Sequence, residues 1–365
     1  MATQLQTSIK RFSYIVRILV AVLAGLYLAL MVLFNLPQVR SYLSETISAE
    51  LSRKLGTSFR VGDVHVASIN RIDLKDVCLL DHQNDSLFKS KRVSAQFNFS
   101  DLLHRKQIII NHLDLFDTFC KIYRPDEKTA CNYQFVIDSL SSPSSDSKGK
   151  IELLIRTLMV RNLNLRYDCL DKKRIYDQLD PNHLNLTKVD ADMRINKVAK
   201  DTLNVRLRNI RLKEQCGLDI KRLAFNFVAG PSETNVYNFS LKLPHSFVEI
   251  KQVHAVNERR NKKLDFRHNR FSDVEIKGEW VPSELAFLYK PLKAFGDTKY
   301  KLSARVNKEG PTVSVASNLN TVGCDDLSLQ ASAVFDIDKW LKKRANIKAD
   351  IHQLYISSNH IKQWM

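Results

Sequence analysis

The polar residues that could support catalysis or bind a metal are few and scattered in this sequence. The segment 81–85 (DHQND) gathers carboxylate, imidazole and amide groups, which are metal-ligand types. It also lies between two strand-like segments, where such residues form hairpin turns, and we favour that interpretation. His104 and His112 lie eight residues apart, and no spacing in the sequence supports a shared metal site. Without a G-x-S-x-G, H-E-x-x-H, Walker or G-x-G-x-x-G motif, we expect neither an enzyme nor a bound cofactor.

Six cysteines offer a second kind of chemistry, as disulfides or as metal thiolates. They are Cys78, Cys120, Cys131, Cys169, Cys216 and Cys324. No two of them form the C-x-x-C pair that is typical of zinc or redox sites. Cys120 and Cys131 could meet across a hairpin, because residues 124–127 have the composition of a turn. The simpler interpretation is that the cysteines are small, partly buried strand residues.

One stretch of 20 residues, from Ile18 to Pro37, carries no charge. As a helix it would be ~30 Å long, which is the thickness of the hydrocarbon core of a bilayer. The apolar part of a cleaved signal peptide is shorter, about 7–15 residues, so we predict a retained, single-pass signal anchor. Lys10, Arg11 and Arg17 precede it, which places residues 1–17 in the cytoplasm and the rest of the chain across the membrane.

The formal net charge of +17 favours an anionic partner. We expect no nucleic acid, because the bulk of the chain lies outside the cytoplasm and no nucleic-acid-binding motif is present. Two alternatives then remain for the charge. It attracts lipid headgroups or lipopolysaccharide, or it only keeps the polar strand faces in solution.

The elements that would position these residues can be predicted from the apolar spacing. Leu43, Ile47, Leu51 and Leu55 recur at four-residue steps, which predicts a short amphipathic helix that ends at Gly56. We expect this helix to pack against the end of a sheet, although it could lie on the membrane.

From residue 59 onward the period of the apolar residues changes to two, which predicts strands with one apolar face. The clearest runs are 93–99, 237–243, 300–306 and 327–337. The Ser-rich residues 139–150 are typical of a linker or loop, and the Lys- and Arg-rich residues 251–270 of a mobile basic loop. Short helices are expected after Ser283 and after Asp336 or Asp338.

One apolar pattern, with steps of two, three and two, recurs between residues 72 and 225. Its five copies begin at Ile72, Ile108, Leu158, Val205 and Leu218. A flat strand cannot keep both halves of the pattern on one face, but one extra residue, a β-bulge, restores the phase. We place the bulges at the polar pairs inside the step of three, such as Lys75-Asp76 and Arg161-Asn162.

Several segments together resemble those of a known family. They are the lone anchor, LPQVRSYL at 36–43 leading into a helix that ends RKLG at 53–56, FRVGDV at 59–64, and residues 74–77, 80–87, 93–103, 108–115 and 160–167. In these segments the chain resembles the N-terminal part of the TamB family, within the wider AsmA-like group. The resemblance covers about residues 15–225 and is weaker beyond. TamB-like proteins are usually much longer, so we expect the natural protein to continue.

The resemblance implies a mainly β fold, in which one transmembrane helix precedes an elongated, curled antiparallel sheet that forms an apolar groove, with a few short helices. The expected parts are a cytoplasmic N-terminus (1–17), the transmembrane anchor (18–37), the amphipathic helix (38–56), a first β-groove segment (57–138), the linker or loop (139–150) and a second β-groove segment (151–365).

The resemblance also implies a function in the bacterial envelope. It implies an inner-membrane protein, mostly periplasmic, that carries phospholipid between the inner and outer membranes in outer-membrane biogenesis. Alternatively, such a protein aids assembly of outer-membrane proteins with an outer-membrane assembly partner. The residues expected to line the lipid groove are Ile72, Leu74, Val77, Leu79, Val93, Phe97, Phe99, Leu113, Leu115, Leu163, Leu165, Ile210, Leu223 and Phe225.

Overall fold

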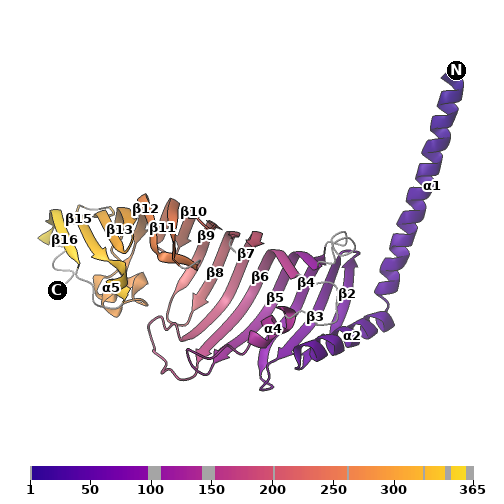
Figure 1. Ribbon diagram of the computed structural model, residues 1–365, viewed down its shortest axis with the longest axis horizontal. Helices are drawn as coiled ribbons and strands as arrows, with labels where there is room; N and C mark the ends of the chain where they lie inside the picture. The colour runs from indigo at the N-terminus through magenta and orange to yellow at the C-terminus, as the bar shows by residue number, and fades with distance from the viewer. Residues whose placement is uncertain are drawn as a thin grey trace. The chain divides into compact units, whose positions relative to one another are not determined.

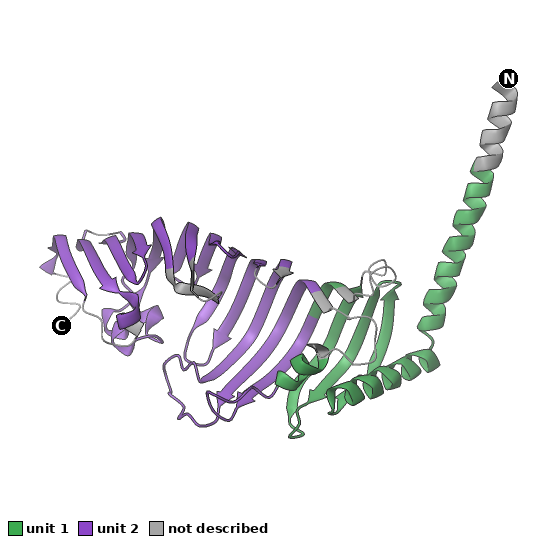
Figure 2. Ribbon diagram, viewed as in Figure 1, with its two compact units in different colours: residues 1–114, 133–154 green, residues 115–132, 155–365 purple. Residues whose placement is uncertain are grey.

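The computed structural model describes residues 2–97, 108–141, 153–199, 202–260, 263–323, 325–341 and 347–358 (Figure 1). The chain forms two compact units (Figure 2). Unit 1 holds residues 1–114 and 133–154, and unit 2 holds residues 115–132 and 155–365. The fold is mainly β with a few short helices, as the sequence predicts.

The first element is the long helix α1 (Ala2–Phe34). Its segment Ser13–Phe34 is long and apolar enough to cross a membrane, and none of that stretch is buried. The helix agrees with the predicted single-pass anchor and contains Ile18. Pro37, the predicted end of the span, instead begins the next helix, α2 (Pro37–Leu55). Proline favours this first helical position because it has no N–H group to satisfy there.

Unit 1 is built on five strands and two further helices. Its strands are β1 (Phe59–Arg60), β2 (Asp63–Ser68), β3 (Arg71–Leu80), β4 (Ser86–Phe97) and the first half of β5 (Ile108–Arg124). The helix α2 packs on β1 and β2, and α4 (Gln134–Ser141) contacts α2. The predicted helical face is confirmed, since its leucines and isoleucine contact the apolar side chains of the strands. Gly56 ends α2 with a φ of 67°, as expected.

Unit 2 holds the remaining strands. They are β6 (Leu153–Cys169), β7 (His183–Ala199), β8 (Thr202–Glu214), β9 (Asp219–Ala229), β10 (Glu233–Lys242), β11 (Phe247–Arg260), β12 (Lys263–Trp280), β13 (Tyr300–Glu309), β14 (Thr312–Thr321), β15 (Leu327–Asp336) and β16 (Lys348–Ile356). Each pairs antiparallel with the next from β6 to β16. All belong to one 16-stranded sheet whose order follows the chain, apart from β1 and β2, which both pair with β3.

β-Bulges keep the apolar residues of a strand on one face of the sheet. On β6, Arg161 and Asn162 lie opposite the single residue Asp190 of β7, which confirms the predicted bulge. Asn162 has a φ of 57°, and its N–H donates to Asp190 Oδ1 at 2.9 Å. The side chain opposite the bulge therefore replaces the ladder hydrogen bond that the extra residue loses.

The same device recurs along the sheet. At four further bulges, two consecutive residues lie opposite a single residue of the neighbouring strand. These pairs are residues 208–209 of β8, 221–222 of β9, 238–239 of β10 and 272–273 of β12. On β12, the N–H of Asp273 (φ 53°) donates to Asn307 Oδ1 at 2.7 Å. The first two pairs lie at the step of three in the repeat, so the spacing predicted them correctly.

One predicted bulge is wrong. Asp76 has a left-handed φ of 51°, but the register between β3 and β4 runs unbroken past Lys75 and shifts only between Leu79 and Leu80. The pairing of β3 with β1 and β2 keeps one register on both sides of Asp76 as well. The turn of the backbone at Asp76 is therefore accommodated without an extra residue.

Three other expectations are corrected by the pairing. Tyr237 does not share a face with Phe239, because the bulge at Asn238 turns it toward Asn226 and Gln252 on the other face.

The predicted basic loop 251–270 instead forms most of the hairpin β11–β12, since its charged residues occupy paired positions at the end of a long ladder. The helix expected after Ser283 is two 3₁₀ turns, η1 (Pro282–Leu285) and η2 (Lys290–Phe295).

The helix expected after Asp336 is confirmed as α5 (Ile337–Leu341). Asp336 Oδ1 accepts a hydrogen bond from the N–H of Lys339 at 3.0 Å, so Asp336 is the cap.

The bulge at Asn238 gives a first testable prediction. Asn238→Gly should change the free energy of unfolding by less than about 0.5 kcal/mol, because glycine adopts a positive φ without strain. Asn238→Val should cost about 1–2 kcal/mol, since a β-branched side chain clashes with the backbone there. Urea denaturation of both variants measures the difference. Equal stabilities would contradict a bulge that depends on the left-handed residue.

Candidate functional site

One row of apolar residues crosses strands β6 to β16 of unit 2. Each residue is paired directly with the next, so all of them lie on one face of the sheet. The row consists of Val160, Ala191, Ile210, Leu223, Leu241, Val248, Gly278, Leu302, Leu319, Leu329 and Leu354. At ~4.8 Å per strand, its ten steps span ~48 Å along the sheet. We call it the apolar row.

A second line of apolar residues runs beside the apolar row on the same face. Met193, Leu207 and Phe225 are paired in succession, two or three residues away from the row on their strands. Phe225 then stacks on Phe239 with ring centroids 6.4 Å apart, and Phe239 pairs with Ile250. The apolar strip is therefore at least two side chains wide across β7 to β11.

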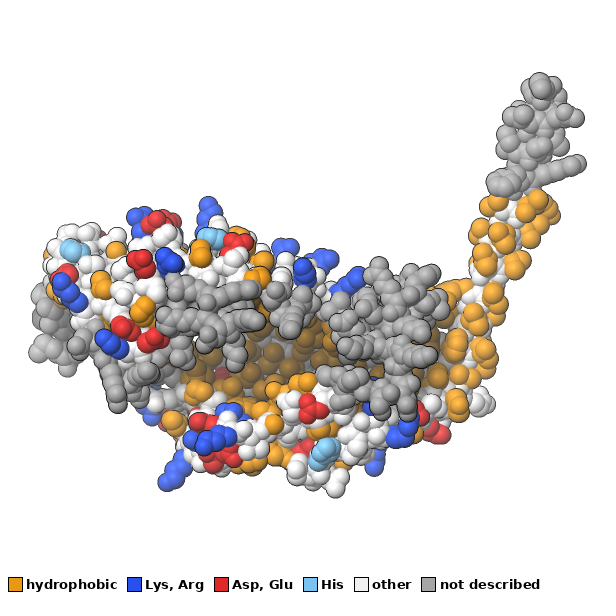
Figure 3. All heavy atoms as spheres, viewed as in Figure 1, with side chains coloured by type: hydrophobic (Ala, Val, Ile, Leu, Met, Phe, Trp, Pro, Cys, Tyr) orange, Lys and Arg blue, Asp and Glu red, His pale blue; other side chains and the backbone are white. Residues whose placement is uncertain are grey.

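Much of this face stays open to solvent. Apolar side chains lie at the bottom of a hollow over β6 to β8 (Figure 3). Leu163, Ile210, Leu223 and Phe225 are only half-buried. Among the helices that the structure describes, none packs extensively against β6 to β14. Such a continuous apolar strip, which no described helix covers, is unusual for a soluble surface and is typical of an interaction or ligand-binding site.

The corresponding face in unit 1 is covered. Ile72, Leu74 and Val93 pack around Val77, under Leu43 and Ile47 of α2. Leu79 packs against the end of α2 and against Phe135 of α4. These predicted lining residues therefore form a closed core beneath two helices, and a direct role in binding a ligand remains a prediction for them.

The other predicted lining residues divide between the two units and the undescribed part of the chain. Ile210 and Leu223 lie in the apolar row, Phe225 lies beside it, and Leu163 and Leu165 pair with Val189 and Leu186 of β7. Phe97, Leu113 and Leu115 are half-buried strand residues of β4 and β5. Phe99 lies outside the described residues.

Gly278 is the one member of the apolar row without a side chain, and the packing explains why. A Cβ at this position would lie 2.3 Å from the backbone oxygen of Phe247 on β11. Only glycine allows the two strands to approach this closely. The strip is therefore thinnest where β12 crosses it.

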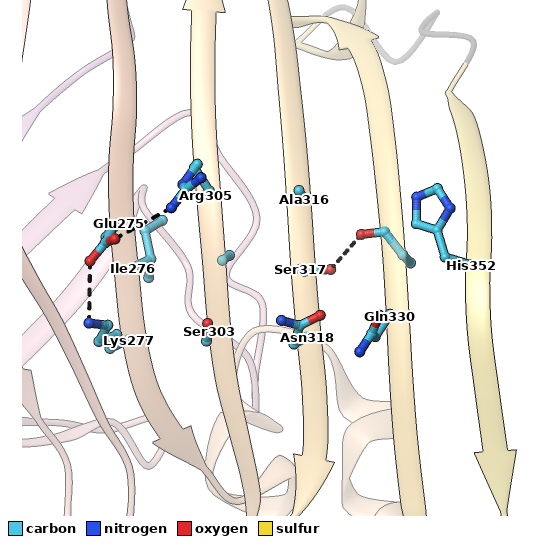
Figure 4. Close-up of a pocket in the computed structure, with 12 residues that line it drawn as sticks. Glu275, Ile276, Lys277, Ser303, Arg305, Ala316, Ser317, Asn318, Gln330 and His352 are labelled. Atoms are coloured by element: carbon cyan, nitrogen blue, oxygen red, sulfur yellow. Dashed lines mark hydrogen bonds and ion pairs between the residues drawn. The ribbon is translucent and has the colours of Figure 1, made fainter.

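The opposite face of β12 to β16 is polar and shallowly hollowed (Figure 4). Glu275 lies 3.2 Å from Lys277 on the same strand and 3.7 Å from Arg305 on β13, and both ion pairs are exposed. Ser332 Oγ lies 2.8 Å from His352 Nε2, but His352 is exposed and Ser332 is only half-buried. This face has the chemistry of a solvated surface, in contrast to the apolar row behind it.

The other residues considered for chemistry can be placed as follows. The segment 81–85 is the predicted β3–β4 turn, in which Asp81 Oδ1 accepts the N–H groups of Gln83 and Asp85. No group of three metal-ligating side chains occurs among the described residues. Cys120 and Cys131 are free thiols, and burial raises the pKa of Cys120 to about 11. His104 and Cys324 lie outside the described residues.

No family model, curated protein or solved structure matches this chain. The function is therefore argued from the apolar strip, the anchor and the contacts that hold them.

The anchor is attached to the sheet inside unit 1. Asn35, which follows α1, donates from Nδ2 to the backbone oxygen of Val66 on β2 at 3.0 Å. Arg40 donates from Nε to Asp63 Oδ1 at 2.9 Å, and Lys75 Nζ lies 3.6 Å from the same carboxylate. Burial opposes ionisation of Asp63, but Arg40 and Lys75 outweigh it and lower the pKa of this carboxyl. The first strands are thus held beside the end of the apolar helix.

Sequence reasoning missed a buried polar cluster at the end of β6. Asp168 receives Arg166 Nε and Arg174 Nη2 at 2.6 Å each, and His183 Nδ1 lies 3.0 Å away. Burial opposes ionisation of Asp168, but the hydrogen bonds of His183, Arg166 and Arg174 lower the pKa of this carboxyl overall. The cluster fixes both ends of the β6–β7 loop, residues 170–182. Its members lie apart in the sequence, so no local spacing predicts this cluster.

Proposed function

We propose that this chain is a non-enzymatic lipid conduit, anchored in a membrane by α1, in which the apolar strip of unit 2 holds acyl chains during transfer. The observation that carries this proposal is the apolar row, which continues over eleven paired strands and contains no polar residue.

The energetics of the strip suit a lipid tail. Removing an acyl chain from water contributes ~0.8 kcal/mol per CH₂ group. A strip of half-buried leucine, isoleucine and phenylalanine side chains offers the tail a surface like the one it leaves. The opposite, polar face keeps the sheet soluble, and the headgroup would remain at the rim in water.

The proposed location rests on the anchor. The basic residues before α1 favour a cytoplasmic N-terminus, and the strands would then lie in the periplasm of a bacterium with two membranes. The chain would carry phospholipid between the inner and outer membranes as part of outer-membrane biogenesis, as the resemblance to the TamB family implies. The hydrogen bond of Asn35 to β2 supports a conduit that begins beside the bilayer.

A second candidate function is a scaffold for the assembly of outer-membrane proteins. Such a scaffold would bind a nascent strand by β-augmentation at an exposed sheet edge. The observation in its favour is the side chains of β16, which are mostly exposed, including Ile351, Leu354 and Tyr355.

Photo-crosslinking at neighbouring positions separates the two functions. A photoreactive residue at Phe225, beside the apolar row, should capture phospholipid from cells, whereas the same residue at Asn226, on the opposite face, should capture at least tenfold less. The position at Leu163 should repeat the result for Phe225. Capture of lipid at both faces alike, or capture of polypeptide alone at Phe225 and Leu163, would refute the conduit.

A further inference from the structure

Two loops of unit 2 that are far apart in the sequence are joined into one structure. The N–H of Leu179, in the β6–β7 loop, donates to the backbone oxygen of Phe287, between η1 and η2, at 2.8 Å. Lys290 Nζ lies 3.6 Å from Asp177 Oδ2 across the same junction. The β6–β7 loop and the β12–β13 loop therefore present a common surface.

Buried carboxylates hold the first of these loops in place. Asp180 is 3% exposed, and its Oδ2 accepts the N–H of Ile175 at 2.8 Å while its Oδ1 accepts the N–H of Asn182 at 3.0 Å. Arg174, next to Ile175, is bound by the buried Asp168. Hydrogen bonds within the loop therefore fix the conformation of residues 174–176 in the absence of a binding partner.

This ordered surface exposes large apolar side chains. Ile175 is 54% exposed and Tyr176 68%, next to Asp177 at the junction. Leu288 is 57% exposed and Tyr289 60%, between Phe287 and Lys290 of the second loop. A single exposed apolar residue is ordinary, but two pairs within two residues of one junction are a surface patch.

Two exposed lysines lie in the same two loops as these side chains. Lys173 and Lys293 are exposed and make no ion pair within the described residues. The nearby Asp177 is already paired with Lys290. We call Lys173, Ile175, Tyr176, Leu288, Tyr289 and Lys293 the loop patch.

We propose that the loop patch docks on an anionic lipid surface. Tyrosine and aliphatic side chains beside lysines are the composition that proteins place at the membrane–water interface. Each lysine near an anionic surface contributes about 1 kcal/mol, so a few side chains suffice for reversible binding. A protein partner would need roughly 800 Å² from each side, which is more than four exposed apolar side chains supply. The proposal does not depend on the lipid conduit.

The test uses the full chain, held through α1 in nanodiscs of phosphatidylcholine. These are floated with vesicles of phosphatidylcholine alone or with one quarter phosphatidylglycerol. We expect the chain to bind the anionic vesicles at least tenfold better than the neutral ones. Ile175→Ser with Tyr176→Ser, and separately Lys173→Glu with Lys293→Glu, should each reduce that binding at least fivefold.

Matched controls decide whether the effect belongs to the loop patch. Lys242→Glu with Lys251→Glu makes the same change of charge at exposed lysines of β10 and β11 and should keep at least half of the binding. Equal losses in both lysine variants, or unchanged binding in both patch variants, would overturn the proposal. If the patch variants instead lose only self-association of the nanodiscs, the occupant is a second copy of the chain and the proposal also fails.

Discussion

If the chain is the proposed lipid conduit, phospholipid should copurify with it, and replacing Leu223 by aspartate should remove most of that lipid. Leu223 lies in the middle of the apolar row, paired with Ile210 on one side and Leu241 on the other. A carboxylate there would have to lose its water or hold water in the strip, and either effect opposes binding of an acyl chain. We expect at least a tenfold loss of bound lipid, measured by native mass spectrometry of the detergent-extracted chain.

The neighbouring residue supplies the control. Arg222 is exposed and pairs with Lys242 on the opposite face, so Arg222→Asp introduces the same carboxylate one residue away. It should leave bound lipid within a factor of two. Thermal melting of both variants separates a loss of binding from a loss of folding. An equal loss of lipid in two folded variants would show that the apolar row does not select the ligand.

The second large effect is expected at Asp168. Asp168→Asn leaves Arg166, Arg174 and His183 without the anion that they surround, and breaking such a buried pair costs several kcal/mol. Because the arginines remain partly exposed, we expect the free energy of unfolding to fall by about 3 kcal/mol, which is the lower end of the range for a broken buried ion pair. Urea denaturation at neutral pH measures it. Asp171→Asn, an exposed aspartate of the same loop, should cost less than about 0.5 kcal/mol.

The pH dependence gives this prediction a second readout. The pKa of Asp168 is lower in the folded chain than its ordinary value, so its stabilising effect is present above the unfolded pKa of about 3.9. It is lost as the pH falls through the lower, folded value. The stability difference between wild type and Asp168→Asn should therefore be present at pH 5 and shrink below about pH 4. A difference that persists to pH 2 would contradict an electrostatic origin.

Local periodicity was sufficient to predict much of this fold. The apolar stretch predicts α1, the four-residue steps predict the packed face of α2, and alternation predicts strands such as β13 and β15. The step of three even predicts the bulge at Arg161-Asn162, because an extra residue there keeps the two apolar halves on one face.

What local periodicity could not supply is the pairing between strands. The apolar row depends on the register of ten ladders, and each register is set by turns and bulges that bring distant residues together. Asn238 turns Tyr237 away from its predicted face although the alternation is unbroken in the sequence. The cluster around Asp168 joins residues 166, 174 and 183 through a loop with no periodic pattern.

The order of the strands has a consequence for how proteins of this kind could vary in size. Because each strand pairs with its neighbour in the chain, one more hairpin adds two members to the apolar row and leaves the others in place. Each such duplication would extend the row by about 10 Å at constant width. Evolution could therefore adjust the reach of such a chain in increments of one hairpin, by copying short segments of its gene.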